Sequence, residues 1–350
     1  MKMKIFKRHR DYGFFDQDLR LSKLSQLGDP LERLAQSIDF EIFRAILELH
    51  LIKLAKGKGG RPPYDYVLLF KILILQRYFA LSDDQTEYQI NDRMSFMRFL
   101  NLTIADAIPD SKTIRNFREI LTDLGLIAPI LDLFLSKLQN LGLILNEGKI
   151  VDASFIEVPK QRNTKEENKQ IKEESTTPEA WKQQPNKLAQ KDTDARWTKK
   201  NDVSYYGYKN HIKTDQKTKL IEKYVVTDAS VHDSQALENL LEIGDKNQRL
   251  YADSAYTGAP LAQIIKSKEM QNQVHEKGYK GKPITDMQKE SNREKSKIRV
   301  RVEHIFGFME NSMHTMKIRS IGIQRATAIV GLMNLTYNMF RAIQLKAMVG

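Results

Sequence analysis

The spacing of apolar residues changes once along the chain, near residue 145, and this change limits the possible folds more than any other feature. Before it, apolar residues recur at the spacing of amphipathic helices, as in 31–54 and 66–81. After it, residues 148–157 alternate as a β-strand does. We therefore expect an all-α N-terminal domain over residues 1–145 and an α/β domain over residues 146–350.

The second half alternates strand-like and helix-like runs, which predicts a mixed sheet with flanking helices. Two β-rich runs, 204–215 and 220–228, are separated by four polar residues and predict a hairpin. Residues 159–200 are polar and poor in aliphatic side chains, and we interpret them as an insertion or a partly disordered arm. The remaining expected elements are a helix over 83–100, one opened by Ser111, one over 127–141, one over 234–243, a strand over 248–252, a helix over 259–266, a strand over 270–274, a basic helix around Glu303 and a long, packed helix over 324–346.

The net charge is the unusual part of the composition, at +12 with histidine neutral. Such a charge favours a polyanionic partner, either nucleic acid or a membrane surface, over a protein that is merely basic. The longest apolar run, Ala326–Phe340, contains two asparagines and is shorter than a bilayer span of about 20 residues, so we expect a buried helix and no membrane partner. The chain has no cysteine, which excludes disulfides and thiolate sites, and its basic start lacks the apolar core of a secretory signal. We expect a cytoplasmic protein associated with the nucleoid.

Three acidic residues lie where apolar elements meet polar edges. Asp152 follows Ile150-Val151, Asp253 ends Leu250–Asp253, and Glu303 lies in a basic helix with an apolar face. Ligands of open α/β sheets bind beyond the carboxyl ends of strands, so the two aspartates can meet there if their strands are neighbours. Three such carboxylates can hold two Mg²⁺ ions on a phosphodiester. On spacing alone, solvated acids at strand ends and a helical ion pair of Arg299 with Glu303 are the favoured interpretation.

Five segments together resemble the DDE transposases of bacterial insertion sequences, in the branch whose catalytic domain follows a helical N-terminal domain. The resemblance extends from about residue 20 to 342. Asp253 lies 101 positions after Asp152, and Glu303 lies 50 positions after Asp253, in the order and spacing of that family. The segments are Gly60–Tyr64, Val151–Ser154, Tyr206–His211, Tyr251–Gly258 and Arg299–Gly307.

This resemblance implies an RNase H-like catalytic domain that cuts transposon ends and joins them to target DNA. Asp152, Asp253 and Glu303 would be both the catalytic acids and the ligands of Mg²⁺, with Mn²⁺ as a possible substitute. The implied partners are double-stranded DNA, as terminal inverted repeats and as target, and a second copy of the chain. At least a homodimer is implied because two ends must be cut together.

The third motif departs from the family's Tyr-x2-Arg-x3-Glu-x6-Lys signature at two positions. Arg299 matches its arginine and stands four residues before Glu303, on the same helical face. Ser296 stands where tyrosine is usual, and Glu310 where lysine is usual. An acid at 310 would repel a phosphate rather than bind it.

Basic residues that we predict to contact DNA lie in several segments. Residues 277–301 contain nine basic and three acidic residues and lead into Glu303, which favours a DNA backbone over a solvated surface. Lys112, Arg115 and Arg118 repeat three apart after Ser111, which suits a DNA-reading helix or an exposed basic face. Gly59–Pro62 resembles a minor-groove hook and fits a plain linker equally well. The predicted DNA-binding residues are Arg61, Lys112, Arg115, Lys209, Lys297 and Arg299.

Two tryptophans, Trp181 and Trp197, lie in the polar insertion. Related transposases can stack a flipped base on an aromatic ring, and Trp197 is the better candidate for that role. The interpretation that we favour is that Trp197 packs the insertion onto the sheet.

Two alternatives to a transposase remain open from the sequence. An RNase H-like nuclease would cut DNA without joining it, and strand-transfer products would separate it from a transposase. A DNA-binding regulator would need the basic helices but not the acids, and it leaves the motifs around Asp253 and Glu303 unexplained.

Overall fold

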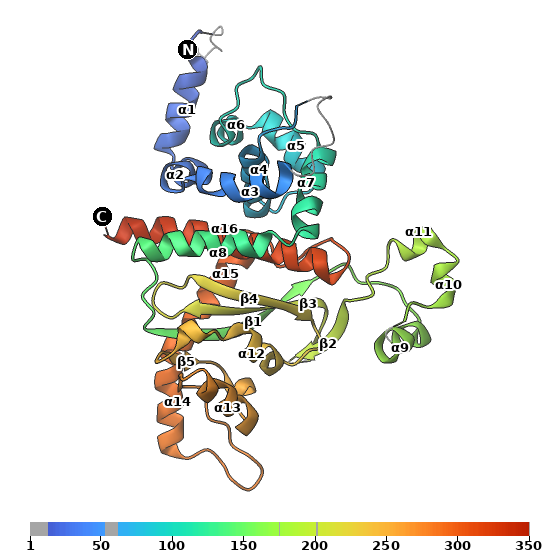
Figure 1. Cartoon of the computed structure of the whole chain (residues 1–350), viewed down its shortest axis with the longest axis vertical. Helices are drawn as coiled ribbons and strands as arrows, with labels where there is room; N and C mark the ends of the chain where they lie inside the picture. The colour runs from blue at the N-terminus through green and yellow to red at the C-terminus, as the bar shows by residue number, and fades with distance from the viewer. Residues whose placement is uncertain (1–12, 53–61, 175, 201, 350) are drawn as a thin grey trace, which may run out of the picture.

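The computed structural model describes residues 13–52, 62–174, 176–200 and 202–349, and it shows a helical lobe stacked on a sheet lobe (Figure 1). The helical lobe comes first in the chain and the mixed sheet follows, as the change in apolar spacing predicts. The N-terminal helices are α1 (Asp16–Gln26), α2 (Pro30–Ser37), η1 (Phe40–Phe43), α3 (Arg44–Leu51), α4 (Tyr66–Tyr78), α5 (Asp83–Asp92), α6 (Met94–Leu100), α7 (Ser111–Asp123) and α8 (Ile127–Asn140).

Two helices that we expected to be continuous are interrupted. The run 31–54 is divided at Ile38, whose backbone is extended, and Asp39 then caps the next turn through the Glu41 N–H at 2.9 Å. The run 83–100 is divided at Arg93, which is also extended. The apolar period survives both breaks because the new helices still direct Phe40, Phe96 and similar residues into the core. Periodicity therefore predicted the buried faces but not the breaks.

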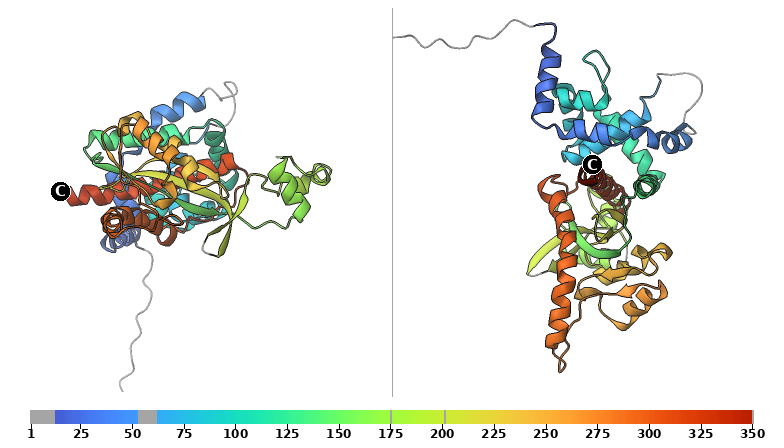
Figure 2. Two further views of the ribbon diagram at one scale, coloured as in Figure 1. Left: turned by 90° about the horizontal axis from the view of Figure 1, so that it is seen from below. Right: turned by 90° about the vertical axis from the view of Figure 1, so that its left-hand side faces the viewer.

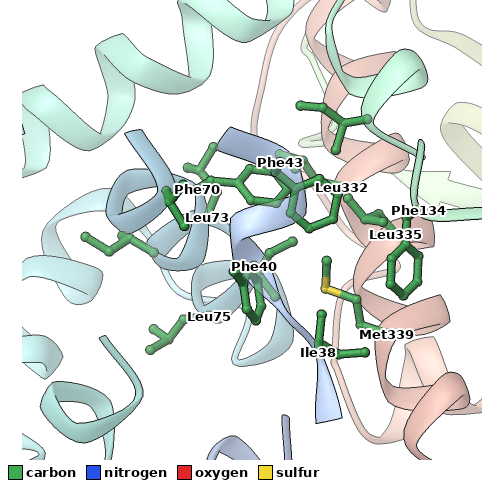
Figure 3. Close-up of a cluster of buried hydrophobic side chains, with 14 of the residues drawn as sticks. Ile38, Phe40, Phe43, Phe70, Leu73, Leu75, Phe134, Leu332, Leu335 and Met339 are labelled. Carbon is green, nitrogen blue, oxygen red and sulfur yellow. The ribbon is translucent and has the colours of Figure 1, made fainter. Parts of the chain in front are cut away.

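The long helix α16 (Ile323–Val349) belongs to two hydrophobic cores at once. On one side, Leu335 and Met339 pack with Phe70 of α4 in the core of the helical lobe (Figure 3). On the other side, Val330 and Met333 pack on the sheet. This confirms that the long apolar run is a buried helix. Among the described residues, no helix has the length and apolarity that crossing a membrane requires.

The sheet has the RNase H-like arrangement that the resemblance implies. β1 pairs with β3 antiparallel on one side and with β5 parallel on the other, and β5 pairs with β6 parallel. The predicted hairpin is β3–β4, and β2 pairs with the start of β3 beside it. The strands are β1 (Gly148–Glu157), β2 (Arg196–Lys200), β3 (Val203–Asp215), β4 (Ile221–Asp228), β5 (Arg249–Tyr251) and β6 (Gln271–Asn272).

Helices cover both faces of the sheet, as Figure 2 shows from two sides. One face packs against α12 and α13, and the other against α15 and α16. The helix expected over 234–243 is shorter, because a 3-10 turn precedes a single α-helical turn. These elements are η3 (Asp233–Ala236), α12 (Leu237–Leu240), η4 (Ile243–Asp245), η5 (Ser254–Tyr256), α13 (Ala259–Ser267), α14 (Asp286–Arg299), η6 (Val300–Val302) and α15 (Glu303–Asn311).

The polar insertion is folded where the structure describes it, so a partly disordered arm was the wrong alternative for those residues. It contains α9 (Lys165–Glu173), α10 (Glu179–Lys182) and α11 (Pro185–Leu188) and projects from the sheet (Figure 1). Trp181 is fully buried, and its indole N–H donates to Glu167 at 2.6 Å. A buried aromatic side chain can thus hold the insertion together although the insertion contains few aliphatic residues.

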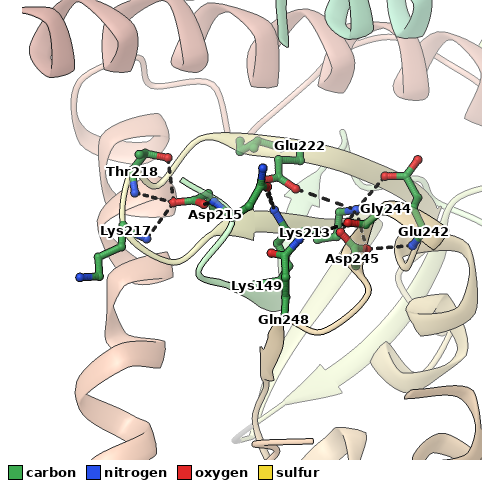
Figure 4. Close-up of polar contacts among 12 residues, drawn as sticks. Lys149, Lys213, Asp215, Lys217, Thr218, Glu222, Glu242, Gly244, Asp245 and Gln248 are labelled. Atoms are coloured by element: carbon green, nitrogen blue, oxygen red, sulfur yellow. Dashed lines mark hydrogen bonds and ion pairs between the residues drawn. The ribbon is translucent and has the colours of Figure 1, made fainter. Parts of the chain in front are cut away.

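A network of buried ion pairs fixes the edge of the sheet where β1 begins (Figure 4). The Lys213 amino group lies 2.8 Å from a carboxylate oxygen of Asp245 and 2.7 Å from one of Glu242. The Lys149 amino group pairs with Glu222 at 2.5 Å. Buried charges are tolerated only when they are paired in this way. The network connects β1 to β4 through Lys149 and Glu222, and β3 to η4 through Lys213 and Asp245.

Candidate active site

The register of the sheet brings Asp152 and Asp253 to the same level. Ile150 of β1 pairs with Tyr251 of the parallel neighbour β5, and each aspartate lies two residues further on. Because both strands run in the same direction, an equal advance keeps the aspartates side by side. Asp152 lies within β1, which continues to Glu157 as the predicted strand does, because β3 pairs with it that far. Asp253 lies beyond the carboxyl end of its strand, two residues after Tyr251.

Asp152 is largely buried on the α15 and α16 face of the sheet. Its Oδ1 accepts the Ala153 N–H at 2.8 Å, and its Oδ2 accepts from Arg299 Nη1 at 2.9 Å. Burial raises the pKa of Asp152 to about 6, and the charge of nearby Asp253 adds to that rise. The raised pKa of Asp152 therefore reflects mainly the burial of its carboxyl group, which outweighs the opposing effect of Arg299.

Glu303 comes to this site through a break in the basic helix. The 3-10 segment η6 separates α14, which ends at Arg299, from α15, which begins at Glu303. Arg299 Nη2 lies 3.2 Å from Glu303 Oε1, so one guanidinium group contacts both Asp152 and Glu303. The Glu303 side chain is 59% exposed and can move. In the described part of the chain, no three acidic or histidine side chains are already grouped to hold a metal ion.

Two further residues near the aspartates escaped the sequence analysis. Tyr256 is 1% exposed, and its hydroxyl has no hydrogen-bond partner within the described structure. Burial raises the pKa of Tyr256 well above its ordinary value, and Asp152 and Asp253 contribute to this rise. Tyr256 lies within the motif around Asp253, and this position in the sequence could have identified it as a residue near the site.

His275 is the second such residue and follows β6. Its N–H donates to Ala252 O at 3.1 Å, which extends the parallel pairing beyond the assigned strand. Its Nε2 lies 3.2 Å from the hydroxyl of Ser296, the residue that stands where the family has tyrosine. Burial and the charge of Arg299 lower the pKa of His275, so it remains neutral at neutral pH. Its position at a strand end could have identified it, by the same argument used for Asp253.

The basic residues of α7 separate into two groups. Lys112 and Arg115 are exposed. Arg118 instead turns into the protein, where its Nη1 lies 2.6 Å from Asp83. Three residues at a spacing of three do not stay on one side, because each step of three turns a helix by about 300° rather than a full circle.

The other predicted DNA contacts differ in how accessible they are. Lys297 is exposed and pairs with Glu294 at 2.5 Å. Lys209 is buried, and its amino group lies 2.8 Å from Asp233. A DNA contact at Lys209 would require this ion pair to open. Arg61 and most of the predicted minor-groove hook lie outside the described residues.

Trp197 lies on β2 and packs against Tyr206, with a ring-centroid separation of 5.1 Å. It remains 44% exposed, and the Lys160 amino group lies 5.6 Å from its ring centre. Both packing and stacking on a ligand are compatible with this position.

Comparisons with known proteins find two matching family models and a similar solved structure. A family model described as "Transposase DDE domain" matches residues 145–339, and one described as "Transposase domain (DUF772)" matches residues 19–119. Among solved structures, the chain is similar to a cryo-EM structure of a piggyBac transposase synaptic complex with hairpin DNA, at 14% identity and a TM-score of 0.42, over 92% of this chain and 76% of that one.

Proposed function

The chain belongs to the family of DDE transposases, and on that premise we propose that Asp152, Asp253 and Glu303 are the acids with which it cuts and joins DNA. The observation that carries this proposal is the convergence of three distant segments. The register of β1 and β5 supports the pairing of the two aspartates. The contacts of Arg299 with Asp152 and Glu303 support the place of the third acid.

Enzymes of this family use divalent metal ions, and we propose Mg²⁺ for this chain, with Mn²⁺ as a substitute. The donor set fits, because carboxylate oxygens are the ligands that Mg²⁺ prefers. The raised pKa of Asp152 also fits, because burial disfavours its ionised form and a bound cation would offset that cost. Two bound metal ions would activate the attacking oxygen and stabilise the leaving oxygen. For Glu303 to join this site, Arg299 must release Asp152.

The released Arg299 would be free to contact the DNA backbone at the scissile phosphate. A guanidinium group binds two phosphate oxygens at once, which positions the strand as well as neutralising it. Lys297 lies two residues before Arg299 on α14 and is exposed, so it would hold an adjacent phosphate. We assign Lys209 a smaller role, because its pairing with Asp233 competes with DNA.

We infer that the helical lobe, residues 1–145, recognises the terminal inverted repeats, and that residues 146–350 perform catalysis. Lys112 and Arg115, exposed on α7, are the described residues best suited to contact DNA, and Arg61 would reach a minor groove. The reaction would begin with hydrolysis at the transposon end and continue with attack by the freed 3′-hydroxyl on target DNA. Coordinated cutting of two ends requires at least a homodimer, and the DNA partner would place it in the nucleoid.

The test is strand cleavage of the element's own end DNA in Mg²⁺. Asp152→Asn, Asp253→Asn and Glu303→Gln should each lose activity by about a thousandfold or more. Asp286→Asn, at an acid that is 97% exposed at the start of α14, is the matched control and should retain activity. Cleavage by Asp152→Asn at the wild-type rate would refute the assignment. Cleavage without strand transfer would favour a nuclease, and DNA binding without cleavage a regulator.

A further inference from the structure

A basic groove runs from the helical lobe to the insertion, outside the predicted active site. One part, of about 740 Å³, lies between α7, the turn before α5 and residues 314–321. A second part, of about 280 Å³, lies between residues 158–162 and 187–192. Arg319, Ser320 and Ile321 line both parts, so the two form one continuous surface.

The groove is strongly positive. Its smaller part is lined by Lys160, Arg162, Lys187, Lys191 and Arg319 against a single acid, Asp192. The larger part adds five more basic residues and only two acids. Both of those acids are already paired, Asp83 with Arg118 and Glu119 with Arg325. Lys187 lies 3.6 Å from Glu167 as well. Within the described structure no ion pair involves Lys160, Arg162 or Arg319, so the groove keeps an excess of positive charge that attracts a polyanion.

The backbone of residues 316–318 holds the central cations outward. Glu157 N–H donates to Met316 O at 2.9 Å, and Ile318 N–H donates to Glu157 O at 2.9 Å, so the segment adds to the end of β1. Ile318 is buried in a hydrophobic core, whereas Lys317 and Arg319 on either side of it are exposed. Neither forms an ion pair with a carboxylate in the described structure.

Arg77 at the floor of the larger part is also short of negative charge. Its Nε is buried without a hydrogen-bond partner. Burial and the charge of neighbouring Arg118 together lower the pKa of Arg77 to about 10. A bound anion would relieve this condition.

We propose that this groove binds the phosphate backbone of the transposon-end duplex next to the site of cleavage. The identity of the occupant rests on the proposed function, whereas the groove itself does not. Glu157 lies five residues beyond Asp152 on β1, or roughly 17 Å at a strand rise of about 3.3 Å. One turn of B-DNA is about 34 Å long, so a duplex held at Asp152 reaches the groove within a single turn.

The absence of native cysteine allows a direct test by site-specific crosslinking. A single cysteine introduced as Ser320→Cys, at the centre of the groove, would carry a photoactivatable crosslinker. Ser267→Cys is the matched control, because Ser267 is exposed on α13 at the opposite face of the sheet. The probe is a linear duplex that carries one terminal inverted repeat of the element and its flanking DNA. We expect crosslinks from position 320, within one turn of the cleavage site, and none from position 267.

Charge variants give an independent readout. Lys317→Gln and Arg319→Gln should each reduce the slope of log affinity against log salt by about 1, for any duplex sequence, because each removes a phosphate contact. Lys266→Gln, on α13, should leave the slope unchanged. Wild-type salt dependence in both groove variants, or DNA cleavage without a crosslink from position 320, would refute DNA binding by the groove. Neither result would count against the proposed function. A crosslink from position 320 in a protein that never cuts DNA would support the groove and refute the proposed function.

Discussion

Arg299 and Asp152 are 147 positions apart in the chain, yet Arg299 Nη1 lies 2.9 Å from Asp152 Oδ2. The same guanidinium reaches Glu303, so Arg299 stands between two of the acids that we assign to the metal site. A cation that binds both acids must therefore take the place of this arginine, which is then free for a phosphate. The contact links metal binding and DNA binding through one side chain.

Replacement of Arg299 by glutamine should strengthen Mn²⁺ binding in the absence of DNA and slow strand cleavage. The competing positive charge is lost, but so is the proposed phosphate contact. The opposite signs of the two effects make this test specific. Mn²⁺ affinity can be measured by electron paramagnetic resonance at about pH 8, where Asp152 is ionised. Unchanged Mn²⁺ affinity would show that Arg299 does not compete with the ion.

The pH dependence of metal binding follows from the raised pKa of Asp152, about 6, which burial causes. The folded protein keeps a proton on Asp152 that the unfolded chain releases at lower pH, so ionisation of this group lowers folding stability as pH rises toward 6. A metal ion requires the ionised carboxylate, so its apparent affinity should fall about tenfold per pH unit below 6. A Mn²⁺ titration between about pH 5 and pH 7 measures this, and an affinity that is flat across that range would contradict it.

Tyr256→Phe should weaken metal binding and cleavage by about tenfold to a hundredfold, because we expect its buried hydroxyl, which has no partner in the described structure, to donate to one of the two aspartates once a metal ion is bound. Folding stability should change little, because the buried hydroxyl has no partner to lose within the described structure. Tyr208→Phe is the contrasting control. The Tyr208 hydroxyl lies 2.8 Å from Asp192, so its removal should lower the free energy of unfolding and spare metal affinity. Equal metal affinity in wild type and Tyr256→Phe would exclude the role.

Gly331→Ala should destabilise the protein by about 1–3 kcal/mol, the usual cost of overpacking. A Cβ at Gly331 would lie 2.2 Å from the Tyr224 hydroxyl oxygen and 2.6 Å from a methyl group of Ile127, so α16 would have to move away from β4 and α8. Gly244→Ala is the control, because a Cβ there meets no atom within 4 Å. Urea unfolding monitored by circular dichroism compares the two, and equal midpoints would contradict the prediction.

Lys213→Met should cost about 3–5 kcal/mol of unfolding free energy, because it leaves Asp245 buried without its cation. Lys223 pairs with Glu242 as well, but its side chain is 36% exposed. Lys223→Met should therefore cost less than about 1 kcal/mol. A similar loss in both variants, measured by the same unfolding titration, would show that burial does not decide the strength of these pairs.

Local sequence predicted the parts of the fold that depend on neighbours in the chain. The helix that we expected to open at Ser111 is α7, which begins at that residue, and the strand predicted over 148–157 is β1. The pairing of Asp152 with Asp253 needed one more condition, that their strands are neighbours. The structure meets that condition through the parallel register of β1 and β5.

Other features depend on contacts that the sequence does not place. The pairing of Lys209 with Asp233 depends on how η3 folds back on the sheet. The pairing of Arg118 with Asp83 depends on how α5 meets α7. The insertion packs around Trp181, and the spacing of apolar residues does not predict that this side chain is buried. In each case a single long side chain finds its partner only after the elements have docked.

The double membership of α16 has a consequence for synthesis of the protein. Leu335 and Met339 complete the interior of the first lobe, although they follow its own helices by about two hundred positions. While the ribosome is still making the sheet lobe, Phe70 and its neighbours lack their covering, and the nascent chain must keep that surface from aggregation. The binding of the transposon end that we propose for the first lobe would thus have to wait until α16 has emerged from the ribosome, which would couple DNA recognition to a finished catalytic lobe.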